Sequence, residues 1–153
     1  MNRARVAFAF AAAGLIAMPA GTAAREGPAA ASAEQNYVLH CRGCHGADGA
    51  GVAHRVPPLR GTLGRFMRSS EGREFVLRVP GAANSRLPDA ALAAVMNWAA
   101  VTFAGGEATA DLRWFTAEEV AAARRRPLLA VRNTRGEVVR RLAASGIVIA
   151  DDY

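Results

Sequence analysis

The chain has 153 residues, of which 52% are hydrophobic and 21% are charged, and its formal net charge is +6. This length and composition suit one ordinary domain, or a small domain with an extension. They exclude a disordered chain, a coiled coil and a large barrel of eight strands and helices. All 19 basic residues are Arg, and the only two cysteines lie within one stretch of five residues.

The N-terminal segment predicts export. Arg3 and Arg5 precede an uncharged apolar run over residues 6–18, and small residues follow it. This order is typical of a secretory signal peptide, which we expect to span residues 1–24 and to be cleaved. A membrane anchor is the alternative, but thirteen residues at about 1.5 Å each fall short of a hydrocarbon core of about 30 Å. We therefore expect a periplasmic chain with no membrane span after cleavage.

The first predicted helix of the mature chain begins after a capping box. Ser32 is followed three positions later by Gln35, so a helix is predicted from about Ala33. This helix would carry both cysteines on its last turns. Tyr37 lies four residues before Cys41 and shares a helix face with it.

The two cysteines stand in the stretch CRGCH at residues 41–45. A disulfide across two intervening residues would close a tiny loop and add little stability, so the pair indicates chemistry rather than structure. A dithiol redox centre needs a strand–helix–strand context, which the surrounding sequence lacks. A structural zinc site needs four ligands, and His40 and His54 have the wrong spacing to complete one.

Covalent haem attachment is the third interpretation, and it accounts for the whole stretch. Cys41 and Cys44 are spaced i, i+3, so on a helix both sulfurs can reach the two vinyl groups along one edge of a porphyrin. His45 follows directly and places its imidazole under the iron. The sequence therefore predicts covalently bound haem c, with its iron held by His45.

At this point the chain resembles the mono-haem class I cytochromes c. The resemblance covers about residues 33–104 and includes PPLRG at residues 57–61 and LPDAAL at residues 87–92. It implies an all-α fold, in which a cytochrome c-like haem domain over residues 25–105 is followed by a helical C-terminal extension over residues 106–153.

The resemblance also implies roles for individual residues. The carbonyl of Pro57 is expected to accept a hydrogen bond from His45 and thereby to orient its ring. Tyr37 is expected to pack against the closing helix near Trp98. The haem domain of about 72 residues is too small for a strong core by itself, so we expect the chain without haem to be poorly folded.

Further helices follow in chain order. Short helices are predicted over residues 62–67 and 71–79, and a longer one from Pro88 to Phe103, whose apolar residues recur on one face. In the extension, capping boxes predict two helices, which run from Thr116 to Arg126 and from Thr134 to Ser145. Because each is short and needs tertiary contact to persist, we expect them to wrap the haem domain rather than to dock a partner.

The sixth iron ligand stays open. Members of the family usually carry a Met in the loop before the closing helix, and here that loop, residues 80–86, contains none. His40 precedes the motif on the proximal side and is expected to be exposed. Met96 fits the apolar stripe of the closing helix as an ordinary core residue. The remaining possibilities are Met67, Met96, His54, Asn84 or a water molecule.

Six arginines flank the predicted haem pocket: Arg60, Arg65, Arg68, Arg73, Arg78 and Arg86. One or two are expected to pair with haem propionates, and the others to form a solvated face. A basic rim of this kind would steer an acidic redox protein partner. Export and the lack of interleaved aromatic residues argue against nucleic acid as a partner.

We therefore expect an electron carrier rather than an enzyme. It would move one electron at a time, to or from a periplasmic dehydrogenase or oxidase. The alternative is a c-type haem protein with an open or exchangeable sixth iron site, acting as a small-ligand sensor or an enzyme. For a peroxidase the chain offers His54 at best as a distal acid–base group. A third class is a binding module held together by haem, with no turnover of electrons.

Overall fold

The computed structural model describes residues 31–106 and 109–150. Over these residues the chain forms helices and no strand, so the predicted all-α fold class is confirmed. A single antiparallel bridge joins Val52 to Val56 within the loop that follows the CRGCH stretch. None of the helices in these two ranges is long and apolar enough to cross a membrane. The expected signal peptide, residues 1–24, lies outside the described residues.

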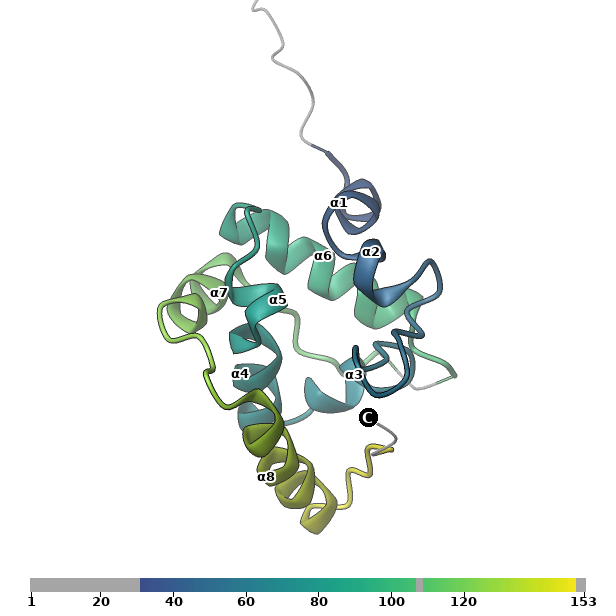
Figure 1. Ribbon diagram of the computed structural model, residues 1–153, viewed down its shortest axis with the longest axis vertical. Coiled ribbons are helices and arrows are strands. Elements are labelled where there is room, and N and C mark those ends of the chain that lie inside the picture. The colour runs from purple at the N-terminus through teal and green to yellow at the C-terminus, as the bar shows by residue number, and fades with distance from the viewer. Residues whose placement is uncertain (1–30, 107–108, 151–153) are drawn as a thin grey trace, which may run out of the picture.

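Figure 1 shows α6 crossing the upper part of the molecule, with α1 packed against one part of it and α7 against another. Below α6, α4 contacts α3, α5, α7 and α8. The helices are α1 (Ala33–His40), α2 (Arg42–His45), α3 (Leu63–Phe66), α4 (Ser70–Arg78), α5 (Pro80–Ala83), α6 (Asp89–Thr102), α7 (Ala117–Arg124) and α8 (Val131–Ala144).

An aromatic cluster joins α1 to α6. The ring of Tyr37, which is 2% exposed, lies 5.2 Å from the ring of Trp98 and 5.1 Å from the ring of Phe103, measured between centroids. Trp98 and Phe103 meet edge to face at 5.6 Å. Such tilted and edge-to-face contacts suit the charge distribution of aromatic rings. The predicted packing of Tyr37 near Trp98 is confirmed.

The closing helix α6 starts and packs nearly as the sequence predicts. Pro88 is its N-cap, and Asp89 in the first turn suits the positive end of the helix dipole. The predicted stripe is buried at Leu92, Val95 and Ala99, and Met96 is half-buried against the same core. The apolar periodicity therefore identified the face that α6 turns inward.

Three boundaries differ from the prediction. The expected first helix is broken at Cys41, whose φ of −123° ends α1 and begins α2. The expected loop at residues 80–86 begins with the short helix α5, because Pro80 suits the first helical position. The last helix begins at Val131 rather than after Thr134. The Thr134 hydroxyl donates to the carbonyl of Ala130 at 3.0 Å, within the helix, and caps nothing.

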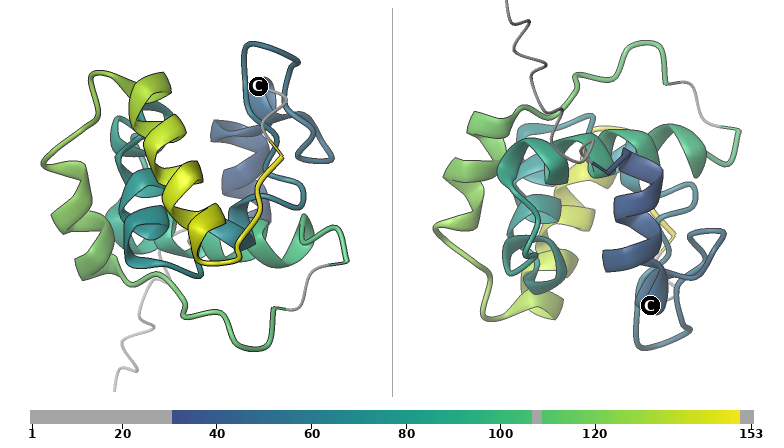
Figure 2. Two further views of the ribbon diagram at one scale, coloured as in Figure 1. Left: turned by 90° about the horizontal axis from the view of Figure 1, so that it is seen from below. Right: turned by 90° about the horizontal axis from the view of Figure 1, so that it is seen from above.

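The extension packs on the haem domain, as expected. Helix α7 contacts α4, α5 and α6, and α8 contacts α4 (Figure 2). The Thr116 hydroxyl caps α7 by accepting from the Glu119 backbone N–H at 3.2 Å. Val120, Val138 and Leu142 are buried in one hydrophobic cluster, which also contains side chains of α1, α3, α4 and α6.

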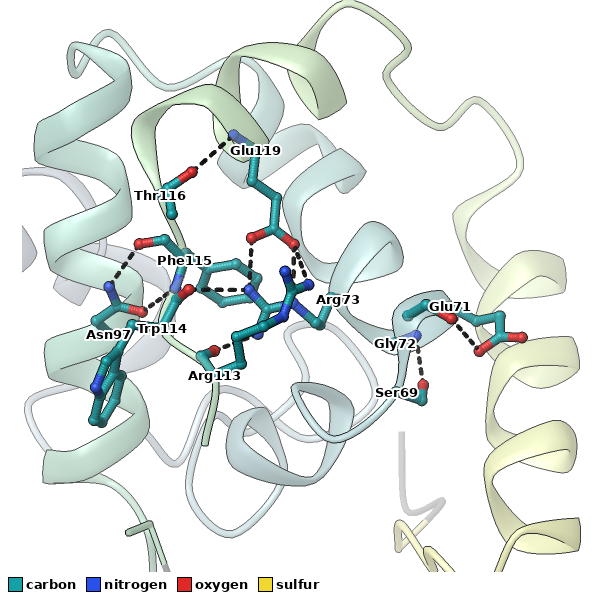
Figure 3. Close-up of polar contacts among 11 residues, drawn as sticks. Ser69, Glu71, Gly72, Arg73, Asn97, Arg113, Trp114, Phe115, Thr116 and Glu119 are labelled. Atoms are coloured by element: carbon teal, nitrogen blue, oxygen red, sulfur yellow. Dashed lines mark hydrogen bonds and ion pairs between the residues drawn. The ribbon is translucent and has the colours of Figure 1, made fainter. Parts of the chain in front are cut away.

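The prediction for Arg73 is wrong. Its guanidinium neither lies on a solvated face nor flanks a pocket but is 3% exposed. It donates to the two carboxylate oxygens of Glu119 at 2.9 and 2.6 Å and to the carbonyls of Arg113 and Trp114 (Figure 3). It also lies 4.3 Å above the ring centroid of Phe115. Arg73 therefore anchors the extension to α4.

Candidate functional site

The two cysteines lie where α1 meets α2, and their thiols are free. Cys41 is half-buried against the hydrophobic core, whereas Cys44 is exposed. The N–H groups of Cys44 and His45 both donate to the carbonyl of Cys41, at 3.1 and 3.0 Å, and wind the motif into one helical turn. Burial, aided by the nearby Cys44, raises the pKa of the Cys41 thiol, so this sulfur is held protonated.

The imidazole of His45 points one nitrogen into the protein. Its Nδ1 is buried and has no hydrogen-bond partner of full geometry among the described residues. The backbone carbonyl of Pro57 nonetheless acts on the ring. Burial lowers the pKa of His45, and the Pro57 carbonyl opposes that shift by favouring a protonated nitrogen. The ring is therefore neutral near pH 7, which is the form that binds a metal.

This arrangement fits a haem. A proton on Nδ1, facing the Pro57 carbonyl, leaves the Nε2 lone pair of His45 for iron. The described residues contain no group of three or more His, Cys, Asp or Glu side chains that could hold a metal ion. A porphyrin would supply the equatorial nitrogen ligands that the protein does not provide. The structure thus brings together Cys41, Cys44, His45 and Pro57, whose roles toward iron stay predictions.

Tyr37 ties the motif to the aromatic cluster. Its hydroxyl donates to the carbonyl of Gly46, the residue after His45, at 2.7 Å. The same side chain fills the contact between α1 and α6. The peptide next to the expected iron ligand is therefore fixed from the core side.

Gly51 is a site residue that the sequence analysis missed. It has a φ of +70°, and its N–H donates to the carbonyl of His45 at 3.0 Å. A Cβ at this position would lie 2.3 Å from the carbonyl oxygen of Val56 and 2.8 Å from that of Pro57. Only glycine allows this approach, and the approach brings Pro57 to His45. The one signal was a glycine in a loop that contains several.

Replacing Gly51 with Ala is expected to destabilise the protein by about 2 kcal/mol or more. The positive φ alone costs a side chain about 1–2 kcal/mol, and the added methyl group also meets backbone that must shift. Denaturant unfolding measures the loss. The matched control is Gly81→Ala in α5, where a Cβ meets nothing within 4 Å. Equal stability of the two variants would contradict the role of Gly51.

The structure separates the candidates for the sixth ligand into two groups. Met67 is 2% exposed, at the end of α3, and Met96 is half-buried on α6. His54 and Asn84 are exposed, and so is His40, as predicted. A ligand that shields iron from water must itself be shielded, so the two methionines are better placed than the two loop residues.

Two curated proteins are similar to this chain. Cytochrome c-552 of Thermus thermophilus is 30% identical over 98 residues, an alignment that covers 52% of this chain and 75% of the relative. The chain belongs to the c-type cytochromes. A second cytochrome c-552, from another strain record of the same organism, gives the same identity over 98 residues and is covered to 66% of its length. No protein-family model matches the chain, and no solved structure matches it.

Membership of this family implies haem c and iron as the cofactor. In this cytochrome the neutral imidazole of His45 and the free thiols one turn before it are the groups that such a cofactor requires. The comparison and the local chemistry thus agree on the cofactor class, although they rest on independent observations.

Proposed function

We propose that this cytochrome is a mono-haem class I carrier of the bacterial periplasm, which takes up and releases one electron at a time. One observation carries the proposal: the half-buried, neutral imidazole of His45 lies against the Pro57 carbonyl, directly after a free thiol at Cys44. When bound, the haem iron supplies the one-electron couple. The donor or acceptor is a periplasmic dehydrogenase or oxidase.

The cysteines attach the cofactor. The S–H group of Cys41 or Cys44 adds across a vinyl group, so a carbon–sulfur bond forms and the thiol hydrogen goes to the other vinyl carbon. This addition needs no oxidant. Because Cys41 is packed against the core and Cys44 faces outward, the attached edge lies at the boundary between protein and solvent. Such an edge suits electron exchange with a docked protein.

His45 and its supports keep the iron environment constant. Its Nε2 binds the iron, and its Nδ1–H faces the Pro57 carbonyl, which fixes the ring and raises its basicity. The hydrogen bond from Tyr37 to Gly46 and the approach at Gly51 hold the backbone on either side. A ligand set that moves little between oxidation states favours fast electron transfer.

Charge supports an acidic partner. The chain has a net charge of +6, although part of its basic character is neutralised within the fold. Arg60 pairs with Asp48 at 2.7 Å and Arg68 with Asp111 at 2.9 Å. Arg42, between the two cysteines, is exposed at the attachment site. Electron exchange with an acidic partner is therefore expected to slow as ionic strength rises.

A sulfur-specific test separates the two buried methionines. Met67→Leu and Met96→Leu keep the side-chain volume nearly unchanged and remove the sulfur. If a methionine is the sixth ligand, one variant loses the far-red ferric absorption band of a methionine–iron bond. That variant also has a lower reduction potential, because thioether ligation stabilises ferrous iron. Absorption spectra in both oxidation states and a potentiometric titration measure these effects.

A reversible one-electron couple in the wild-type cytochrome is the result expected of a carrier. A couple that does not exchange electrons at physiological potentials would contradict the proposal and would favour a binding module.

The second candidate is a haem protein with an open or exchangeable sixth site. The observation that favours it is the segment 80–86, which contains no Met and begins with α5. If neither methionine variant alters the spectrum, both methionines are packing residues and this candidate is preferred. A high-spin spectrum that changes on addition of carbon monoxide would identify it.

A further inference from the structure

The extension reaches the loop between α5 and α6 through one side chain, Arg124. Its Nε donates to the carbonyl of Ala83 at 3.1 Å, and its Nη2 donates to the carbonyl of Ser85. Its Nη1 donates to the carbonyl of Leu87 at 2.9 Å and to the carboxylate of Asp89 at 2.7 Å. One guanidinium therefore binds every second residue from the end of α5 to the start of α6.

The chemistry of these contacts is specific to arginine. Helix α5 ends at Ala83, so the carbonyls that follow have no partner in a continuing helix. A planar guanidinium presents several N–H groups in one fork and can bind them together, whereas a lysine ammonium cannot match this geometry. The Arg124 side chain is 21% exposed, so its bonds are largely shielded from water.

Arg124 projects from a firmly held base. Helix α7 buries Val120 completely and Ala123 almost completely. At its N-terminal end, Thr116 caps the helix, and Glu119 binds the buried guanidinium of Arg73 (Figure 3). A helix anchored at both ends can hold a loop in place without moving with it.

The loop lies across the fold from the attachment motif. Both α2, which carries His45, and α5 lie on the same side of α6 and face one another in Figures 1 and 2. The loop that Arg124 holds, residues 83–87, continues directly from α5 and buries Ala83 and Leu87. Its exposed residue Asn84 and the small residues around it contain no sulfur that could close the iron site.

We propose that Arg124 is a positioning residue that locks the loop 83–87, and that through this loop the extension limits how freely small molecules reach the iron on the side away from His45. The inference rests on the proposed function, because it requires a haem attached at Cys41 and Cys44. It assigns the extension a role in the haem site that its own sequence, which has no chemical motif, does not reveal.

The test compares Arg124→Gln with Arg125→Gln in the holo-cytochrome. Arg125 is the neighbouring residue and is exposed. Hydrogen exchange is followed at the amides of Asn84 and Ser85, which donate to the carbonyls of Pro80 and Ala82. Losing charge-assisted hydrogen bonds is expected to speed this exchange about tenfold or more in Arg124→Gln. The rate of carbon monoxide binding to the ferrous protein is expected to rise with it, and Arg125→Gln is expected to match wild type in both.

The outcomes are distinct. Faster exchange without faster carbon monoxide binding would show that Arg124 holds the loop but does not control access, and would overturn the inference. Unchanged exchange would also overturn it. If Arg124→Gln does not fold, Arg124→Lys, which keeps the charge but loses the fork, replaces it with the same expected directions. The haem content of each sample is measured first, since wild-type protein without haem would contradict the proposed function itself.

Discussion

Replacing both cysteines, as Cys41→Ala together with Cys44→Ala, is expected to abolish covalent retention of haem and to leave the chain largely unfolded. Without thioether bonds, His45 alone must hold the cofactor. A haem domain of about 72 residues has too small a core to fold well without the apolar bulk of the porphyrin. Haem remaining with the polypeptide after extraction with acidified organic solvent, together with circular dichroism, measures both effects.

The single variants are the matched controls. Cys41→Ala and Cys44→Ala each leave one thioether bond, so each is expected to keep haem through extraction, at lower yield. Because Cys41 packs against the core and Cys44 is exposed, the Cys41 variant is expected to be the less stable of the two. A double variant that retained covalent haem would refute the assignment of both residues.

Replacing Arg73 with Met is expected to destabilise the holo-cytochrome by about 3–5 kcal/mol, as for other ion pairs that lose one buried partner. The substitution keeps an apolar side chain of similar length but removes every donor. It leaves the Glu119 carboxylate and the carbonyls of Arg113 and Trp114 without the guanidinium that binds them. Denaturant unfolding followed by haem absorption and by circular dichroism measures the change in the free energy of unfolding.

Arg113→Ala provides the control for Arg73. The Arg113 side chain touches the same carboxylate of Glu119, at 3.2 Å, but it is 70% exposed. Removing it keeps the backbone carbonyl that Arg73 binds, so the expected cost is that of a surface ion pair, about 0–1 kcal/mol. Equal losses for Arg73→Met and Arg113→Ala would mean that burial does not distinguish these two contacts.

Local signals predicted much of the fold. The capping box at Ser32 and Gln35 is present in the structure with both of its hydrogen bonds, at 2.8 and 3.2 Å. The box at Thr116 likewise begins α7. The apolar periodicity of α6 identified its inward face. These features depend on residues close in sequence, whose spacing directly encodes a cap or a helix face.

Features that depend on distant partners were not predictable. Arg73 and Arg124 occur in segments rich in arginine, and nothing local marks either one as buried or bridging. Their partners lie far away along the chain, at Glu119 and at the loop 83–87. The start of α8 was missed for a related reason, because this helix is held by packing of its apolar side chains on α4 rather than by a side-chain cap.

At the site, the motif identified the groups but not their supports. The spacing of Cys41, Cys44 and His45 predicted the chemistry, and the resemblance supplied Pro57. The role of Gly51 depends on how a loop folds back on itself, and its φ of +70° is visible only in three dimensions. The Tyr37 hydroxyl was likewise expected only as part of an aromatic contact, although it also binds the carbonyl of Gly46.

The most direct measurement is the intact mass of the mature cytochrome, produced in a host that exports it and attaches haem to c-type cytochromes. We predict the mass of the polypeptide plus one haem, with the added mass mapped to a peptide that contains Cys41 and Cys44. The mass of the unmodified polypeptide, under conditions in which a control c-type cytochrome acquires its haem, would contradict the assignment.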